Sequence, residues 1–171
     1  GEYESATTAQ RSLVPGLVPA GAAMLLIIVA LFNALRPMLI IVAAIPFALI
    51  GITAGLLATG AAFGFMALLG ALSLTGMMIK NAVVLIDQIR ANRRDGQDAF
   101  EALVDAAKLR LRPVLLAAGT TILGMTPLLS DPFWVSMAIT IMAGLAVGTL
   151  ITMVFVPVVY ALAHNIQPPA R

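Results

Sequence analysis

The chain contains about five apolar runs of roughly 18 or more residues, separated by short polar breaks. Each run is long enough to cross a hydrocarbon core of about 30 Å as a helix. Charged residues make up 11% of the chain and its mean hydropathy is +1.03, whereas a soluble domain has roughly 25% charged residues. The sequence therefore predicts an all-α membrane protein with five transmembrane helices.

The predicted transmembrane helices cover residues 15–35, 37–58, 62–90, 113–129 and 133–163. Pro15 and Pro19 fall in the opening turns of the first, where missing amide hydrogens cost little. Pro46 lies inside the second and should kink it. In the last, the spacing of Gly144 and Gly148 permits close helix contact.

Residues 95–111 are polar, but their apolar residues recur at helical spacing. Phe100, Leu103, Val104 and Ala107 share one face of such a helix. We therefore predict one amphipathic helix that lies along the cytoplasmic membrane surface between the third and fourth spans.

The basic residues indicate the orientation of the chain, because Lys and Arg concentrate in cytoplasmic loops. With residues 164–171 as a cytoplasmic tail, only Arg11 lies outside and Lys80 within the membrane. The residues that then lie inside are Arg36, Arg90, Arg93, Arg94, Lys108, Arg110, Arg112 and Arg171. Residues 1–14 begin outside without the features of a signal peptide, so we interpret them as the end of an upstream part of a longer protein.

Composition also excludes several classes of function. The chain has no cysteine and one histidine, so we predict neither a metal site nor a cofactor. The net charge of +2 is explained by topology, and we expect no nucleic acid partner. The predicted spans hold no paired nucleophile and base, which argues against an enzyme.

Lys80 is the residue in this chain that most strongly suggests chemistry. It lies on the order of 15 Å from the cytoplasmic end of its predicted helix, at a depth where an unpaired ammonium is costly. Ser73, Gly76 and Asp87 share its helix face, and small residues beside a charge suit a packed interface. Asp87 is about 10 Å away along the axis and is expected to be interfacial. The alternative for Lys80 is snorkelling, in which the long stem carries the charge to the interface.

Other polar residues in the spans have two interpretations each. Asn81 is either a member of a proton relay or a packing clamp between helices. Thr120 and Thr121 either face Lys80 or hydrogen-bond to carbonyls of their own helix. Trp134 and Tyr160, near the two ends of the last span, are expected to anchor it at the interfaces, with His164 an exposed tail residue just beyond.

Three segments, FGFMALLGALSLTGMMIKNAVVLIDQIR, RLRPVLLAAGTTILGMTPLL and DPFWVSMAITIMAGLAVGTLITMVFVPVVYAL, resemble the last membrane helices of resistance-nodulation-division (RND) efflux pumps of Gram-negative bacteria. The opening GEYES resembles the end of the periplasmic portion before their eighth helix. The resemblance covers essentially the whole chain and implies helices eight to twelve of a twelve-helix subunit. The full-length subunit would form a homotrimer in the bacterial inner membrane and exchange protons for substrate.

The resemblance also implies partners and site residues. Lys80 matches, by its Lys-Asn-Ala context, the lysine that pairs with two aspartates on the fourth helix, which lie outside this chain. Arg110 matches a basic position near the proton's exit, while Ala117 stands where many members have a hydroxyl residue. Implied partners are the rest of the transporter chain, a periplasmic adaptor, an outer-membrane channel and lipid.

The resemblance favours the multidrug and hydrophobe exporters over the heavy-metal branch. Substrate specificity in the family resides in periplasmic porter domains, which are absent from this sequence. Two alternatives have distinct mechanisms. One is a proton-driven protein-export accessory of the same superfamily, and the other is a non-transporting membrane scaffold subunit.

Overall fold

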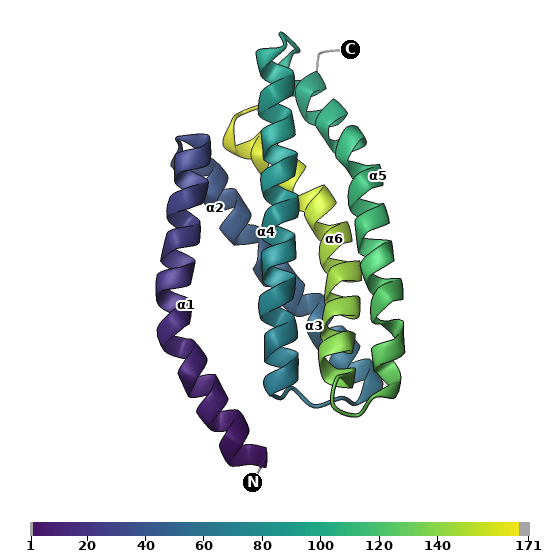
Figure 1. Ribbon diagram of the computed structural model, residues 1–171. Helices are drawn as coiled ribbons and strands as arrows, with labels where there is room; N and C mark the ends of the chain where they lie inside the picture. Colours follow the sequence, from purple (N-terminus) through teal and green to yellow (C-terminus); the bar gives the residue numbers. More distant parts are fainter. Residues whose placement is uncertain (1, 168–171) are drawn as a thin grey trace.

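In the computed structural model, which describes residues 2–167, the chain is folded almost entirely into helices (Figure 1). Five stretches of helix are long and apolar enough to cross a membrane within this part of the chain, which confirms the predicted fold class. The helices are α1 (Glu2–Phe32), α2 (Leu35–Ala44), α3 (Pro46–Thr59), α4 (Phe65–Arg94), α5 (Ala99–Met125), the 3₁₀ helix η1 (Thr126–Ser130) and α6 (Val135–Ala163).

Helix α6 is the centre of the bundle and packs against α3, α4 and α5. Helix α1 stands at one side, where it contacts α2 and α4 (Figure 1). Helices α1, α4 and α6 run in one direction, and α5 and the α2–α3 pair run in the other. This alternation is the one that five successive membrane crossings require.

The predicted kink at Pro46 is confirmed, and it breaks the second span into two helices. Helix α2 ends at Ala44 and α3 begins at Pro46, with Ile45 between them. Proline has no amide hydrogen and its ring crowds the preceding turn. The chain closes the break with a tighter turn, in which the Ile45 amide donates to the Val42 carbonyl at 3.2 Å.

The predicted helix at residues 95–111 is not separate from the span at 113–129, so the prediction of two helices was wrong. Both belong to the continuous helix α5, which passes through Pro113. Of the predicted apolar face, Leu103 is buried, whereas Phe100, Val104 and Ala107 are half-buried. Ala102 and Ala106 are buried beside Leu103, and their helix packs on α4 and α6. The buried face of this segment therefore covers other helices.

The first span also differs from the expectation. Helix α1 begins at Glu2, so the lead-in predicted for residues 1–14 is helical from Glu2 onward, and residue 1 lies outside the described part. Pro15 and Pro19 stand in the helix interior and not in its opening turns. Of the predicted tail at 164–171, residues 168–171 lie outside the described residues.

Glycines let α6 approach its neighbours closely, as the spacing of Gly144 and Gly148 predicts. A Cβ atom on Gly148 would lie 2.9 Å from the Met78 sulfur on α4. On α3, a Cβ atom on Gly51 would lie 2.8 Å from the Ala143 carbonyl oxygen and 2.9 Å from the Gly144 Cα atom. The contact between α3 and α6 is therefore made by backbone against backbone.

Candidate functional site

Lys80 lies on a face of α4 that no described helix covers. Its side chain is exposed, and so are Ser73, Gly76 and Asp87, the other members of the predicted stripe. A Cβ atom built on Gly76 would meet nothing within 4 Å. The opposite face of the same helix is buried against α6, as the complete burial of Leu74 and Ala82 shows. The polar stripe is thus the outward surface of this bundle.

Within residues 2–167, the Lys80 ammonium makes no hydrogen bond and no ion pair. Asn81, the next residue, is half-buried and its amide likewise has no hydrogen-bond partner in the described part of the chain. The two adjacent polar side chains are therefore both available to groups outside this bundle.

The two threonines of α5 bond to their own helix. The Thr120 hydroxyl donates to the Leu116 carbonyl at 2.7 Å, and the Thr121 hydroxyl donates to the Ala117 carbonyl at 2.9 Å. Thr120 is exposed and Thr121 is half-buried. A hydroxyl that donates to a carbonyl keeps its oxygen as an acceptor, so these bonds do not remove either group from a polar site.

Arg110 belongs to a polar network between α4 and α5. Its Nη2 donates to Gln88 Oε1 at 3.0 Å, and Gln88 Nε2 donates to Asn92 Oδ1 at 2.9 Å. The buried Asn92 then donates from Nδ2 to the Ala102 carbonyl at 3.1 Å. The Nε atom of Arg110 is buried and has no partner in the described chain. Sequence reasoning missed Gln88 and Asn92, although their spacing of four residues was a usable signal.

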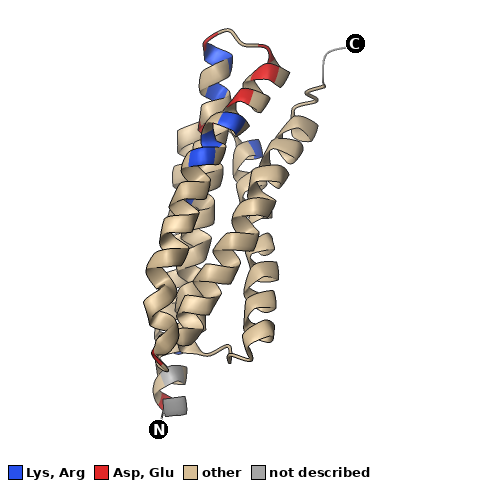
Figure 2. Cartoon of the chain, turned by 90° about the vertical axis from the view of Figure 1, so that its right-hand side faces the viewer, with Lys and Arg blue, Asp and Glu red and all other residues tan. Residues whose placement is uncertain are grey.

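Most of the charged residues gather at one end of the bundle (Figure 2). We call this the basic end and define it by Arg36, Arg90, Arg93, Arg94, Lys108, Arg110 and Arg112. Helices α1, α4 and α6 end here, and α5 begins here. Two arginines of the basic end donate to the last carbonyls of other helices. Arg90 Nη1 lies 2.6 Å from the Phe32 oxygen, and Arg36 Nη1 lies 3.2 Å from the Ala163 oxygen.

Tyr160 and His164 lie together at this end, and the prediction for His164 needs correction. Tyr160 is buried, and its ring stacks on His164 with a centroid separation of 4.2 Å. His164 is half-buried, with Nδ1 3.1 Å from the Tyr160 carbonyl oxygen. The pair closes the end of α6, so His164 is not the exposed tail residue that the sequence predicts. At the other end, Trp134 is exposed and meets Phe133 edge to face at 5.0 Å.

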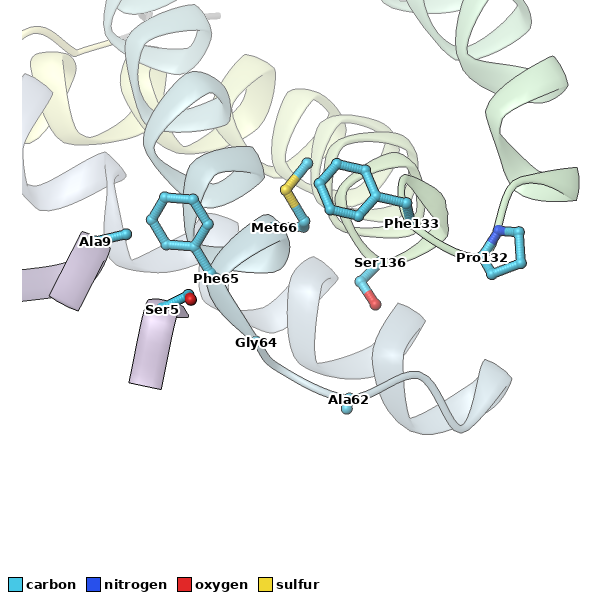
Figure 3. Close-up of a pocket in the computed structure, with 9 residues that line it drawn as sticks. All are labelled: Ser5, Ala9, Ala62, Gly64, Phe65, Met66, Pro132, Phe133 and Ser136. Atoms are coloured by element: carbon cyan, nitrogen blue, oxygen red, sulfur yellow. The ribbon is translucent and has the colours of Figure 1, made fainter. Parts of the chain in front are cut away.

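A cavity of about 870 Å³, whose lining does not include Lys80, lies at the end where α1, α4 and α6 begin (Figure 3). Most of its lining is apolar, with hydroxyl groups from Ser5 and Ser136. Among the residues that the structure describes, no three His, Cys, Asp or Glu side chains are close enough to hold a metal ion.

The sequence comparisons with known proteins agree with one another on the family. Residues 1–164 match the sequence profile of the AcrB/AcrD/AcrF family. Swarming motility protein SwrC of Bacillus subtilis (strain 168) is 34% identical over an alignment of 142 residues that covers 80% of this chain. Cobalt-zinc-cadmium resistance protein CzcA of Cupriavidus metallidurans is 32% identical over 172 residues, covering 96% of it. Multidrug resistance protein MdtC of Erwinia tasmaniensis is 33% identical over 143 residues, covering 78%.

The fold agrees with these sequence matches. A crystal structure of a heavy metal efflux pump superposes with a TM-score of 0.83 at 27% identity and covers 96% of this chain, which in turn covers 17% of that pump. The chain spans only 13% of the length of SwrC, 16% of CzcA and 14% of MdtC. Since the family profile matches residues 1–164, the chain belongs to the AcrB/AcrD/AcrF family, and its resemblance to RND transporters is confirmed.

Proposed function

We propose that this chain is part of the membrane domain of a proton-driven efflux transporter, a drug/proton antiporter, and contributes the lysine side of its proton relay. The observation that carries the proposal is the uncovered polar stripe of α4, with Lys80 in mid-span and no partner within residues 2–167. A charged residue at the centre of a lipid-facing helix costs about 2.5–3.5 kcal/mol. The stripe therefore fits an interface with further helices of the same transporter.

The chemistry of the relay follows from the charge of Lys80. An ammonium lowers the energy of nearby ionised carboxylates and thus favours their deprotonated form. Protonation of those carboxylates would release Lys80, and a helix pair with two packings would then change state. The carboxylates would come from the helices that cover the stripe, because the other described acids are not paired with Lys80.

The other proposed relay members would support Lys80 through hydrogen bonds or charge. Asn81 would hydrogen-bond across the same interface, and Thr120 and Thr121 would accept hydrogen bonds through their hydroxyl oxygens. Arg110, held by Gln88 at 3.0 Å, lies at the basic end, which we assign to the cytoplasm. A proton released there would leave near a fixed positive charge.

The proposal includes the setting of the whole transporter. It would be a multi-pass protein of the bacterial inner membrane and a homotrimer that works with a periplasmic adaptor and an outer-membrane channel. For the substrate we propose the multidrug and hydrophobe branch, supported by the match to MdtC. The match to CzcA makes metal-ion export the second candidate. Efflux of a hydrophobic dye, measured beside resistance to zinc and cadmium, separates the two.

The deciding experiment compares the full-length transporter with its Lys80→Ala variant at matched expression in the membrane. Efflux of a fluorescent substrate should be lost while trimer assembly is unchanged. Lys108→Ala is the matched control, because Lys108 is exposed at the basic end and outside the relay. Unaltered efflux in Lys80→Ala would make Lys80 a snorkelling residue and would end the relay proposal.

A further inference from the structure

A second cavity, of about 450 Å³, opens at the basic end between α1, α4 and α6. Its α4 wall carries Arg90, Arg93 and Arg94, and its α1 wall is formed by Leu31 and Phe32. The stacked rings of Tyr160 and His164 supply the α6 side. The cavity therefore has a cationic wall facing an apolar one.

All three arginines in this cavity keep free donors, because a guanidinium has five N–H groups. The Arg90 guanidinium is oriented toward α1, since it donates to the Phe32 carbonyl at 2.6 Å and lies 5.0 Å from the centre of the Phe32 ring. Arg93 donates one bond, to the Gln97 carbonyl at 3.3 Å. Arg94 makes no hydrogen bond within residues 2–167, and both side chains are exposed. Asp87 is the one acid among the described lining residues, so positive charge is in excess.

The apolar wall continues from the cavity along α1. Leu31 is 58% exposed, and Ile27, one helical turn earlier, is 67% exposed. Phe32 is the last residue of this membrane-spanning helix, so the cavity lies at the depth where phospholipid head groups begin. An occupant that suits all of these features has an anionic head beside an acyl chain.

We propose that this cavity binds the phosphate group of an anionic phospholipid. Arg93 and Arg94 donate to the phosphate oxygens, as guanidinium groups do in bidentate pairs, and an acyl chain lies along Leu31 and Ile27. Arg90 holds the end of α1 in place as the opposite wall. Basic pockets between transmembrane helices are a known setting for anionic head groups. The proposal depends on the packing of α1, α4 and α6, and the cavity shares Asp87 with the polar stripe of α4 that carries Lys80.

Native mass spectrometry of the full-length transporter tests the site. The protein is titrated with phosphatidylglycerol and with phosphatidylcholine of the same acyl chains. Wild type should retain phosphatidylglycerol in excess, and the double variant Arg93→Gln/Arg94→Gln should weaken that retention by about 30-fold, since each basic residue near the surface contributes about 1 kcal/mol. The double variant Lys108→Gln/Arg112→Gln removes the same charge from exposed residues of α5 at the same end and should retain the lipid like wild type.

Three outcomes would overturn the proposal. Equal phosphatidylglycerol retention by wild type and Arg93→Gln/Arg94→Gln would place the lipid elsewhere. Retention of phosphatidylglycerol no better than phosphatidylcholine by wild type would mean that other parts of the transporter fill the cavity. Displacement of phosphatidylglycerol by inorganic phosphate or by glycerophosphoglycerol, which has no acyl chains, would show a phosphate site and not a lipid site.

Discussion

Arg110 on α5 donates from Nη2 to the Gln88 side-chain oxygen on α4 at 3.0 Å. This hydrogen bond joins the two helices below the turn that connects the end of α4 to the start of α5. Gln88 in turn donates to Asn92, and Asn92 donates to the backbone of α5 at Ala102. Three side chains thereby hold the α4–α5 hairpin closed near the basic end.

Replacing Gln88 by leucine should destabilise this hairpin. The partly buried Arg110 guanidinium loses its acceptor, and an unsatisfied buried polar group costs about 1–3 kcal/mol. The midpoint of thermal unfolding of the full-length transporter in detergent should fall. The midpoint should fall less in Gln88→Glu, which keeps an oxygen acceptor for Arg110. Equal midpoints for Gln88→Leu and wild type would contradict the assigned role of Gln88.

Adding a methyl group at Gly51 should force α3 and α6 apart. The new Cβ atom would meet the Ala143 carbonyl oxygen at 2.8 Å, and backbone cannot rotate away as a side chain can. Overpacking of this kind costs about 1–3 kcal/mol. Gly119→Ala is the control, because nothing lies within 4 Å of its Cβ position. Thermal unfolding of both variants checks the prediction, which fails if Gly51→Ala is as stable as Gly119→Ala.

Removing the Arg90 guanidinium should loosen the end of α1. In Arg90→Gln, the Phe32 carbonyl loses a 2.6 Å hydrogen bond and the Phe32 ring loses its cation. Hydrogen exchange of amides in the last turn of α1 should become faster. Arg36→Gln provides the comparison, because Arg36 donates to Ala163 at the end of α6. Unchanged exchange in α1, or equal acceleration in α1 and α6 for both variants, would argue against a specific clamp.

Replacing Thr120 by valine should reduce efflux, whereas Thr120→Ser should preserve it. The Thr120 hydroxyl donates its hydrogen to the Leu116 carbonyl, and its oxygen can still accept a hydrogen bond at an exposed position of α5. Valine keeps the shape and removes that acceptor. Thr126→Val is the matched control, since Thr126 makes the same type of bond, to Ile122, outside the proposed relay. Dye efflux of these variants at matched expression tests the prediction. Full activity in Thr120→Val would show that Thr120 is not a member of the relay.

The amino-acid sequence by itself determined that there are five spans, a kink at Pro46 and a close approach at Gly144 and Gly148. These features depend on local chemistry, namely the length of an apolar run, a missing amide hydrogen and a missing side chain. The sequence also showed that Lys80 has no carboxylate partner on its own helix within reach, and the structure finds none in residues 2–167.

Only the tertiary structure decided what covers each face and where each donor bonds. The periodicity at 95–111 marks an apolar face, but such a face can rest on lipid or on another helix, and here Ala102, Leu103 and Ala106 rest on other helices. Arg90 and Arg36 bond to carbonyls 58 and 127 residues away, pairings that no local pattern encodes. The physical reason is that helix periodicity specifies the direction of a side chain from its own axis, whereas its partner depends on how separate helices pack.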